Sequence, residues 1–366
     1  MKRKKTILIA CGGTGGHITP GMALGNALKE ELPDFEIMYI FSDKKITQSF
    51  LKSLKDPYVI VREIQIRGLR NIIQVFARTM GTLIKISMLL FKKKIVLVIG
   101  FGSATSFVAV FAGFLFLKPC VVLEQNAVMG RANRIASLLV RRIYLTLPLA
   151  SGAKSVKYCL TGNPMRQTVS GAISLDKESI RRQLGLSPEG LTLLILGGSQ
   201  GARSLNQFIL SHLDRLLKEI PEIQFIHLSG PHFLEELRAA YKKSGAGFYL
   251  ASFDPDMGRL YRAADVAMSR AGASTISELS YFGIPTFFVP YPFACDDHQK
   301  RNADFLYSKG GAVVVSDEDI ETDAFFETMK EVLRDREKRK RMSSGMKEAL
   351  LHQASAEIIR DIKQVI

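Results

Sequence analysis

The chain has 366 residues, of which 47% are hydrophobic and 23% are charged. This length exceeds what one hydrophobic core usually organises, so we expect two domains, and the apolar content excludes a disordered chain. The net charge of +15 lies entirely in the first half, because residues 1–160 hold 24 Lys and Arg against 8 Asp and Glu. Such a basic half predicts an anionic partner, which would be a nucleic acid, an acidic membrane surface or a phosphorylated substrate.

Four cysteines are far apart in the sequence, and no His lies at ligand spacing from them. Neither a zinc site nor a disulfide framework is therefore expected. The N-terminal MKRKK runs directly into a strand-like segment without the long apolar region of a signal peptide. We therefore expect the chain to remain in the reducing cytoplasm.

Short β-branched runs alternate with helical patterns along the chain, which is typical of parallel sheets with crossover helices. We predict two doubly wound α/β units joined near Thr161–Pro164, with a ligand-binding cleft between them at the carboxyl ends of the strands. The predicted domains are residues 1–163 and 164–345. The expected strands are 6–11, 36–41, 58–63, 95–100, 120–124 and 142–146 in the first unit, and 191–196, 224–229, 247–251, 266–269, 285–289 and 312–315 in the second.

Two segments of the first half bear on membrane association. Residues 95–117 contain no charged residue and are long enough to cross a bilayer. A turn-forming cluster at 100–106 interrupts them, so we predict a strand, a glycine loop and a buried helix, with a membrane span as the alternative. Residues 67–94 mix bulky apolar residues with Lys and Arg and contain no acid. This pattern favours a segment that lies at a membrane interface, the alternative being that its apolar residues belong to the core.

The first expected strand ends in the sequence CGGTGGH, residues 11–17, and a helical pattern follows. Glycines between a strand and a helix let backbone N–H groups converge on a phosphate. The Lys-Ser/Thr pair of a P-loop is absent, and Ile18 stands where the third glycine of a dinucleotide fingerprint belongs, so nicotinamide binding is a weaker alternative. A tight turn that only packs helix on strand is the other alternative. A second loop, Gly102-Ser103, follows the fourth strand, and together the two loops would hold a diphosphate.

Two similar loops occur in the second half. Gly197–Arg203 and Arg270–Glu278 each follow an expected strand and open a helix, so both are predicted nucleotide-phosphate sites. Glu278 lies four residues after Ser274 on the same helical face, where its carboxylate would accept hydrogen bonds from two ribose hydroxyls. The alternative for this Glu is a solvated surface charge.

Six motifs occur in an order and spacing that resemble the MurG family of bacterial glycosyltransferases: GGTGGH, EQN at 124–126, TGNPMR at 161–166, GGSQGA at 197–202, RAGASTISE at 270–278 and DDHQKRNA at 296–303. The resemblance covers nearly the whole chain. It implies a GT-B fold with the acceptor on the first domain and the donor mainly on the second, and a last helix, 346–366, that packs back on the first domain. It also implies inverting transfer of N-acetylglucosamine from UDP-N-acetylglucosamine to the 4-hydroxyl of undecaprenyl-diphosphate-linked muramyl-pentapeptide.

The resemblance also implies roles for individual residues. His17 would be the catalytic base, since a neutral imidazole is available near pH 7, although a His in an anion loop can instead donate a hydrogen bond to phosphate. The donor-binding residues carried over by motif are Thr14, Gly15, Gly16, Asn126, Arg166, Ser199, Asp254, Ala273, Ser274, Thr275, Ile276, Ser277, Glu278 and Gln299. The acceptor diphosphate would meet Gly13, Gly102 and Ser103.

Three positions depart from the family pattern. Ser103-Ala104 stands where Gly-Tyr is common, Asp254 replaces an aliphatic residue, and His298 replaces a frequent glutamine. Asp254-Pro255-Asp256 is formally the metal-binding D-x-D of the other large glycosyltransferase fold. The motif order favours GT-B, in which this stretch contacts uracil through main-chain groups, so neither a metal nor another cofactor is expected.

The resemblance implies a peripheral enzyme at the cytoplasmic face of the cell inner membrane, with an anionic membrane surface and cell-wall synthesis proteins as partners. No nucleic acid is expected, because the cations accompany no recognition motif, although a nucleic-acid-binding protein remains an alternative from another class. The nearer alternatives are a GT-B transferase acting on another membrane lipid, such as a diacylglycerol glycosyltransferase, and a UDP-sugar-binding homologue without turnover.

Overall fold

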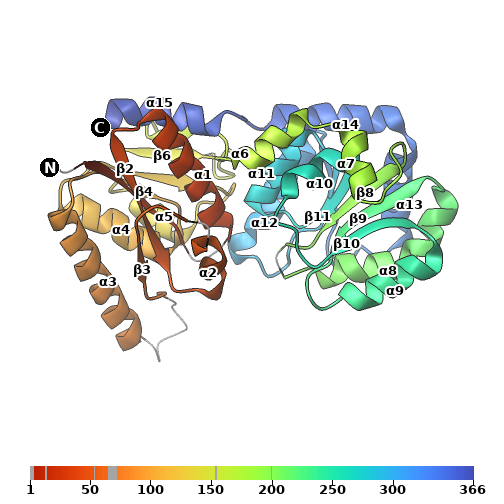
Figure 1. Cartoon of the computed structure of the whole chain (residues 1–366), viewed down its shortest axis with the longest axis horizontal. Helices are drawn as coiled ribbons and strands as arrows, with labels where there is room; N and C mark the ends of the chain where they lie inside the picture. The colour runs from red at the N-terminus through yellow and green to blue at the C-terminus, as the bar shows by residue number, and fades with distance from the viewer. Residues whose placement is uncertain (1–3, 13–14, 53, 65–71, 153–154, 199) are drawn as a thin grey trace. The chain divides into compact units, whose positions relative to one another are not determined.

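The computed structural model describes residues 4–12, 15–52, 54–64, 72–152, 155–198 and 200–366 (Figure 1). Contacts between Cα atoms divide the chain into two compact units. Unit 1 comprises Met1–Arg166 together with Leu351–Ile366, and unit 2 comprises Gln167–Leu350. The chain therefore passes from one unit to the other twice.

Unit 1 contains a parallel sheet in the order β3-β2-β1-β4-β5-β6-β7. Its strands are β1 Lys5–Ala10, β2 Phe35–Ser42, β3 Tyr58–Val61, β4 Ile95–Gly100, β5 Cys120–Glu124, β6 Arg142–Leu145 and β7 Tyr158–Leu160. Its helices are α1 Gly15–Glu31, α2 Lys45–Leu51, α3 Ile72–Lys92, α4 Ser103–Leu115, α5 Arg131–Ala136 and α15 Ala354–Val365. The central strands are buried on both faces, which is why they are apolar without alternation.

Two apolar clusters cover the two faces of this sheet. On one face, α3, α4 and α5 pack over side chains such as Leu8 and Val98. On the other, α1 and the C-terminal α15 pack over side chains such as Ile7 and Leu97. Helix α15 is further held to β6 by the carboxylate of Asp361, which pairs with Arg142 Nε at 3.2 Å and accepts a hydrogen bond of 2.8 Å from a tyrosine of the same strand.

Unit 2 repeats the strand order of the first six strands of unit 1, here as β10-β9-β8-β11-β12-β13, again all parallel. Its strands are β8 Leu191–Leu196, β9 Ile223–Leu228, β10 Gly247–Ala251, β11 Val266–Ser269, β12 Thr286–Phe288 and β13 Ala312–Val314. Its helices are α6 Gln167–Ser170, α7 Lys177–Gln183, α8 Arg203–Glu219, α9 Leu234–Ser244, α10 Met257–Ala263, α11 Ala273–Phe282, α12 His298–Ser308, α13 Asp323–Arg334 and α14 Arg336–Ala349, with 3₁₀ turns η2 Gly171–Ser174 and η3 Cys295–Asp297.

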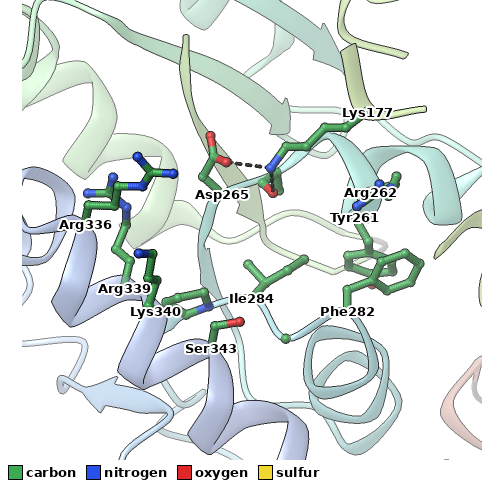
Figure 2. Close-up of a pocket in the computed structure, with 13 residues that line it drawn as sticks. Lys177, Tyr261, Arg262, Asp265, Phe282, Ile284, Arg336, Arg339, Lys340 and Ser343 are labelled. Carbon is green, nitrogen blue, oxygen red and sulfur yellow. Dashed lines mark hydrogen bonds and ion pairs between the residues drawn. The ribbon is translucent and has the colours of Figure 1, made fainter. Parts of the chain in front are cut away.

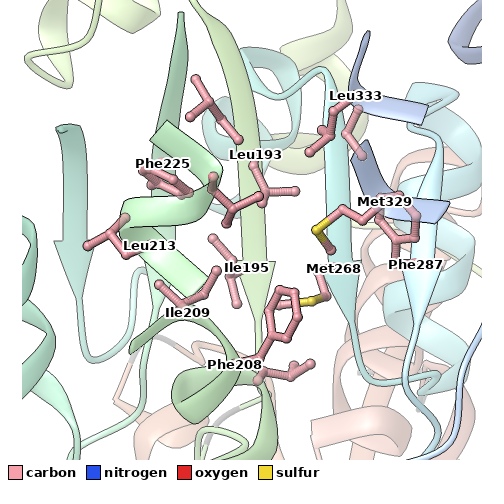
Figure 3. Packing of buried hydrophobic residues seen from close by; sticks show 14 of the residues in the cluster. Leu193, Ile195, Phe208, Ile209, Leu213, Phe225, Met268, Phe287, Met329 and Leu333 are labelled. Carbon is pink, nitrogen blue, oxygen red and sulfur yellow. The ribbon is translucent and has the colours of Figure 1, made fainter. Parts of the chain in front are cut away.

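One core of unit 2 lies between its sheet and helices α8, α9 and α13 (Figure 3). Leu193 and Ile195 of β8 belong to it together with Phe208 of α8, and Phe287 of β12 lies beside Met329 of α13. Helix ends follow from local sequence: the Thr322 side chain caps α13, and Gly283 ends α11 with a left-handed φ of 65°. This cluster of buried apolar side chains gives the loops at the strand ends a packed base.

All twelve predicted strands are present, and Tyr158–Leu160 adds a short edge strand to unit 1. The predicted fold class, two doubly wound parallel sheets, is confirmed. Residues 95–117 form β4, a loop and α4, as predicted. Among the described residues, the helix that is long and apolar enough to cross a membrane is Ile73–Lys92 within α3, by length and composition alone.

Candidate functional site

The four predicted glycine loops occupy equivalent places in the two sheets. In unit 1 they follow β1 and β4, and in unit 2 they follow β8 and β11. Each pair of strands is adjacent and lies where the strand order reverses direction. Ligands of doubly wound sheets bind at this switch point, outside the carboxyl ends of the strands. Each unit therefore presents two loops where a ligand is expected.

In unit 1 the two loops lie side by side around His17. A Cβ added to Gly12 would lie 2.9 Å from His17 Nδ1 and 2.6 Å from Ser103 Cβ. A Cβ on Gly102 would lie 3.1 Å from His17 Nε2. The half-buried imidazole is therefore enclosed by backbone that only glycine permits. Gly15 and Gly16 open α1 directly before it, whereas Gly13 and Thr14 lie outside the described residues.

The second loop of unit 1 has an unusual backbone. Gly102 has a φ of 85° and the following Ser103 has a φ of 77°. The left-handed region costs a residue with a Cβ about 1 kcal/mol or more. The resembling family commonly has glycine where Ser103 stands, so this departure places a serine in a conformation that suits glycine. Ser103 Oγ accepts a hydrogen bond from the Ser106 N–H at 3.3 Å, which offsets part of that cost.

The EQN motif is organised by its buried acid. Glu124 is the last residue of β5, is 3% exposed, and accepts hydrogen bonds from the backbone N–H groups of Asn126 and Gly130 at 3.0 and 2.9 Å. Asn133 Nδ2 donates to the same carboxylate at 2.9 Å, and Asn126 Nδ2 also donates to it at 3.3 Å. Glu124 thus fixes the position of Asn126. Arg166, the last residue of this part of unit 1, is half-buried at the end of the TGNPMR motif.

In unit 2 the loop after β8 requires glycine for two reasons. Gly198 and Gly201 have φ values of 79° and 76°. A Cβ on Gly201 would also lie 2.2 Å from the carbonyl oxygen of Ser229, because the loop after β9 packs directly against it. Ser199, the predicted diphosphate contact of this loop, lies outside the described residues. The loop leads at once into α8, whose first residue is Arg203.

The loop after β11 opens α11 with small residues. Ser274 Oγ is buried and, within the described residues, has no hydrogen-bond partner. A buried hydroxyl without a partner is costly unless a ligand or water satisfies it, so Ser274 indicates a polar guest at this helix start. Ala273, Thr275, Ile276 and Ser277 complete the first turns, with the Ser277 hydroxyl donating to the Ala273 carbonyl at 2.8 Å.

Glu278 lies on α11, one turn after Ser274. Its Oε2 accepts a hydrogen bond of 2.7 Å from the hydroxyl of Tyr261, a buried side chain of α10. The carboxylate is therefore held in place and is not a freely solvated surface charge. Sequence reasoning did not indicate Tyr261, because the two residues are 17 positions apart and meet only when α10 packs on α11.

Gln299, at the start of α12, is tied to the same loop. Its Oε1 accepts hydrogen bonds from the backbone N–H groups of Ala271 at 3.2 Å and Tyr291 at 3.0 Å. Asn302 Nδ2 donates to the Ala271 carbonyl at 3.2 Å from the next turn of the helix. Both amides of the DDHQKRNA motif thus position the loop that precedes α11. His298, the departure beside Gln299, is exposed in part and its Nδ1 bonds the Cys295 carbonyl at 2.8 Å.

Arg270 also supports this loop, a role that sequence reasoning did not assign. Its guanidinium pairs with Asp317 at 2.5 Å and donates to Ser204 Oγ at 3.1 Å. These contacts join the loop after β11 to the start of α8 and to the segment after β13. The partners are separated by dozens of residues in the sequence, so no local motif could have indicated them.

Asp254 has a structural task in unit 2. Its carboxylate is 3% exposed and accepts hydrogen bonds from Tyr249 at 2.6 Å, Arg259 at 2.7 Å and the Asp256 N–H at 2.8 Å. Burial alone would raise the pKa of Asp254, but these three donors outweigh it and the pKa lies below its usual value. The side chain therefore stabilises its own loop. Among the described residues, no group of three or more His, Cys, Asp or Glu side chains is arranged to hold a metal ion.

Comparison with known proteins agrees with this arrangement. Residues 7–145 match the glycosyltransferase family 28 N-terminal domain, and residues 192–359 match the glycosyltransferase family 28 C-terminal domain. A relative from Desulfotalea psychrophila is 32% identical over 368 residues, which cover 100% of this chain and 98% of the relative. Another, from Nitratidesulfovibrio vulgaris, is 32% identical and covers 99% and 98%. Both are named UDP-N-acetylglucosamine–N-acetylmuramyl-(pentapeptide) pyrophosphoryl-undecaprenol N-acetylglucosamine transferase.

Solved structures give the same result for the fold. The crystal structure of Acinetobacter baumannii MurG matches with a TM-score of 0.77 and 26% identity over 99% of both chains. The Neisseria meningitidis UDP-GlcNAc 2-epimerase, solved with UDP-GlcNAc, has a TM-score of 0.68 at 15% identity over 98% of this chain and all of that one, which shows only a shared fold. The predicted GT-B architecture is therefore confirmed, and the chain belongs to the MurG family of bacterial glycosyltransferases, within glycosyltransferase family 28.

Proposed function

We propose that the chain transfers N-acetylglucosamine from UDP-N-acetylglucosamine to the 4-hydroxyl of undecaprenyl-diphosphate-linked muramyl-pentapeptide, a step of peptidoglycan synthesis. The names of its full-length relatives support this reaction. The structural observation that carries it is the first turn of α11, where the buried Ser274 hydroxyl lacks a protein partner in the described chain and Glu278 is held in place by Tyr261.

Unit 2 binds the donor in this proposal. The N–H groups of Ala273 to Ser277 and the Ser274 hydroxyl bind the diphosphate at the positive end of α11. Glu278 accepts hydrogen bonds from the ribose hydroxyls, Gln299 contacts the sugar, and the main chain at Asp254 meets uracil. Arg166, Ser199, Asn126 and residues 14–16 complete the donor contacts.

Unit 1 supplies the base. His17 removes the proton of the muramyl 4-hydroxyl as its oxygen attacks the anomeric carbon of the donor sugar. The bond from that carbon to the diphosphate oxygen breaks, UDP leaves, and the configuration inverts. Negative charge grows on the departing diphosphate, where cationic and N–H donors stabilise it. The acceptor diphosphate lies against Gly13, Gly102 and Ser103. No cofactor takes part in this proposal. The sugar comes from a substrate, and the cationic and N–H donors stabilise the charge of the departing diphosphate.

Helix α3 gives unit 1 a surface for the membrane. Large apolar side chains spaced three or four residues apart form one exposed stripe, with Ile73 and Phe91 each 81% exposed and Phe76 67% exposed. We name this group of side chains the apolar stripe, and it comprises Ile73, Phe76, Met80, Ile84, Met88 and Phe91. The opposite side of α3 packs into the core through Ile86 and Leu90.

Cations accompany the apolar stripe. Arg78 and Lys85 lie on α3 itself, and Lys92 and Lys94 follow at its end, all of them exposed. Apolar groups in the lipid boundary with cations on headgroups are typical of reversible interfacial binding, each cation contributing on the order of 1 kcal/mol on an anionic leaflet. We therefore place the enzyme peripherally on the cytoplasmic face of the cell inner membrane, where the lipid acceptor and cell-wall synthesis proteins are found.

The test is a transfer assay with purified protein, sugar-labelled UDP-N-acetylglucosamine and the muramyl-pentapeptide lipid in detergent, with EDTA present. We expect lipid-linked disaccharide and UDP in equal amounts. Label transferred to diacylglycerol and not to the muramyl lipid would contradict the acceptor and support the other GT-B alternative. Tight UDP-sugar binding without transfer to either lipid would identify a homologue without turnover. Transfer abolished by EDTA and restored by a divalent cation would contradict the metal-free reaction.

A further inference from the structure

Unit 2 contains a second cluster of cations that the proposed reaction does not use. Lys177, Arg262, Arg336, Arg339 and Lys340 line a cavity of about 270 Å³, which we name the basic pocket (Figure 2). Its floor includes the residues directly before β11 and β12, which places it at the amino ends of the strands. The glycine loops of unit 2 lie at the carboxyl ends. The basic pocket is therefore separate from the donor site.

The carboxylate of the basic pocket, Asp265, is already saturated. Its Oδ1 pairs with Lys177 at 2.6 Å, and its Oδ2 pairs with Arg181 at 2.6 Å and accepts the Thr192 N–H at 2.8 Å. Burial alone would raise the pKa of Asp265, but the two cations outweigh it and the pKa lies below its usual value. Among the described residues, Asp265 forms ion pairs with these two cations and with none of the other four cations of the basic pocket.

Those cations are bound mainly by neutral groups. Arg262 Nε donates to a backbone carbonyl at 2.8 Å, and Arg339 donates to two carbonyls at the end of α13. Lys340 pairs with the exposed Glu337 at 2.7 Å, while Arg336 forms no ion pair in the described part of the chain. Burial lowers the pKa of Arg339, which indicates that its charge is partly withdrawn from water. A bound anion would compensate for the hydration that the Arg339 guanidinium has lost.

General basicity does not explain the cluster. Unit 2, Gln167–Leu350, holds 23 Lys and Arg against 25 Asp and Glu, so it is close to neutral. Three of the five cations are arginines, whose planar guanidinium groups bind phosphate oxygens in pairs. The chemistry of the basic pocket thus fits a small phosphorylated anion.

The basic pocket is connected to the donor site through one side chain. Tyr261 lines the pocket, and its hydroxyl donates to Glu278 at 2.7 Å. Phe282 and Gly283, which end α11, also line it. Helix α11 therefore has its first turn at the donor diphosphate and its last residue at the basic pocket, so an anion that shifts Tyr261 also shifts the ribose-binding carboxylate.

We propose that the basic pocket is a second anion site, which binds a soluble phosphate- or diphosphate-bearing molecule and alters donor affinity through Tyr261 and Glu278. Binding itself is independent of the function proposed above, whereas the effect on donor affinity rests on it. Because such coupling is reciprocal, the donor must alter anion affinity by the same factor.

The test for binding is calorimetric titration of inorganic diphosphate into protein already saturated with UDP, so that the donor diphosphate site is occupied. We expect one diphosphate to bind, and the double variant Arg336→Gln/Lys340→Gln to weaken it at least tenfold. The matched control, Arg238→Gln/Lys242→Gln on α9, removes the same charge and should bind normally. Absence of diphosphate binding, equal affinity in both double variants, or binding of an acidic peptide in place of diphosphate would overturn the proposal.

The test for coupling compares UDP affinity with and without saturating diphosphate. We expect a change of at least threefold in the wild type and none in Tyr261→Phe, which keeps the aromatic ring but loses the hydroxyl. An equal change in both proteins, or no change in the wild type, would overturn the coupling. Failure of UDP to bind at all would instead count against the proposed function, while diphosphate binding to the UDP-free protein would still test the basic pocket.

Discussion

Units 1 and 2 share one strand order, and their glycine loops follow equivalent strands, yet their surfaces differ. Unit 1 carries the excess positive charge of the chain and the apolar stripe of α3. Unit 2 is close to neutral, and its polar residues form buried hydrogen bonds, such as the one between Tyr261 and Glu278. Because the topology is the same, this difference shows that the division of labour lies in surfaces and loops.

If unit 1 supplies the base while unit 2 holds the donor, then changing His17 must slow the chemistry without weakening UDP binding. We expect kcat for His17→Ala to fall about 100- to 1000-fold, the usual contribution of a general base. Steady-state transfer assays and UDP calorimetry measure the two quantities. His232→Ala, an exposed His of unit 2, is the control and should keep full activity. A kcat within threefold of the wild type would show that His17 only donates a hydrogen bond.

A change at the ribose-binding carboxylate of unit 2 should instead weaken the binding of UDP. Glu278→Gln keeps the size of the side chain but removes the charge that accepts two ribose hydroxyls. We expect UDP affinity to fall about 30- to 100-fold, since hydrogen bonds to a charged group contribute about 1.5 to 3 kcal/mol each and the amide retains one acceptor. Calorimetry of UDP gives the value, with Glu236→Gln on α9 as the matched control. An unchanged affinity would mean that the ribose lies elsewhere.

We expect the surface that binds the membrane to lie on unit 1 alone. In Phe76→Ser/Phe91→Ser we expect binding to anionic vesicles to weaken about tenfold or more, because each partly buried Phe contributes on the order of 1 kcal/mol. Vesicle sedimentation at low and high salt separates the apolar contribution from the cationic one. Tyr307→Ser removes an exposed aromatic residue of unit 2 and should have no effect. Equal losses from both units would contradict this assignment.

The smallest expected effect concerns the buried polar network of unit 2. Burial lowers the pKa of His227 to about 3, and its ring bonds Tyr241 and Asn206 at 3.0 and 2.9 Å. In the unfolded chain this His titrates near pH 6.5, so below that pH the unfolded state binds more protons. The stability of unit 2 is therefore full above about pH 6.5 and is lost progressively as the pH falls toward 3.

Between pH 7.5 and 5.5 this loss should amount to about 1 kcal/mol. Urea unfolding followed by hydrogen exchange in unit 2 measures it. His227→Gln should be less stable at pH 7.5 but should lose less on acidification, whereas the exposed His232→Gln should keep the wild-type dependence. A His227→Gln variant with an unchanged pH dependence would show that other groups cause the loss.

Much of the fold could be predicted because its signals are local. Strands such as Leu191–Leu196 are buried on both faces and appear in the sequence as continuous apolar runs, and glycines mark the loops that follow them. The three-residue strand Tyr158–Leu160 is not among the predicted strands, because so short an edge strand has little pattern. In the candidate site, motifs indicated Ser274, Glu278 and Gln299.

Contacts made by packing could not be predicted. Tyr261 meets Glu278 across two helices, and Arg270 meets Asp317 across 47 positions. The basic pocket combines four separate stretches of the chain, so its charge appears only in three dimensions. The hydrogen bonds of the Asp254 carboxylate within its own loop were likewise not indicated by the sequence, and the predicted main-chain contact to uracil at this position stays a prediction.

Helix α15 has a consequence for how the protein is made. Ile358, Ile359 and Ile362 belong to the core of unit 1, together with Ile18 and other residues of α1. The ribosome synthesises all of unit 2 between these two parts. Until α15 has been synthesised, the part of the unit 1 sheet face that α15 covers is therefore still exposed, although α1 covers the rest. Unit 2 can finish folding during translation, whereas unit 1 completes its core only after α15 has been synthesised.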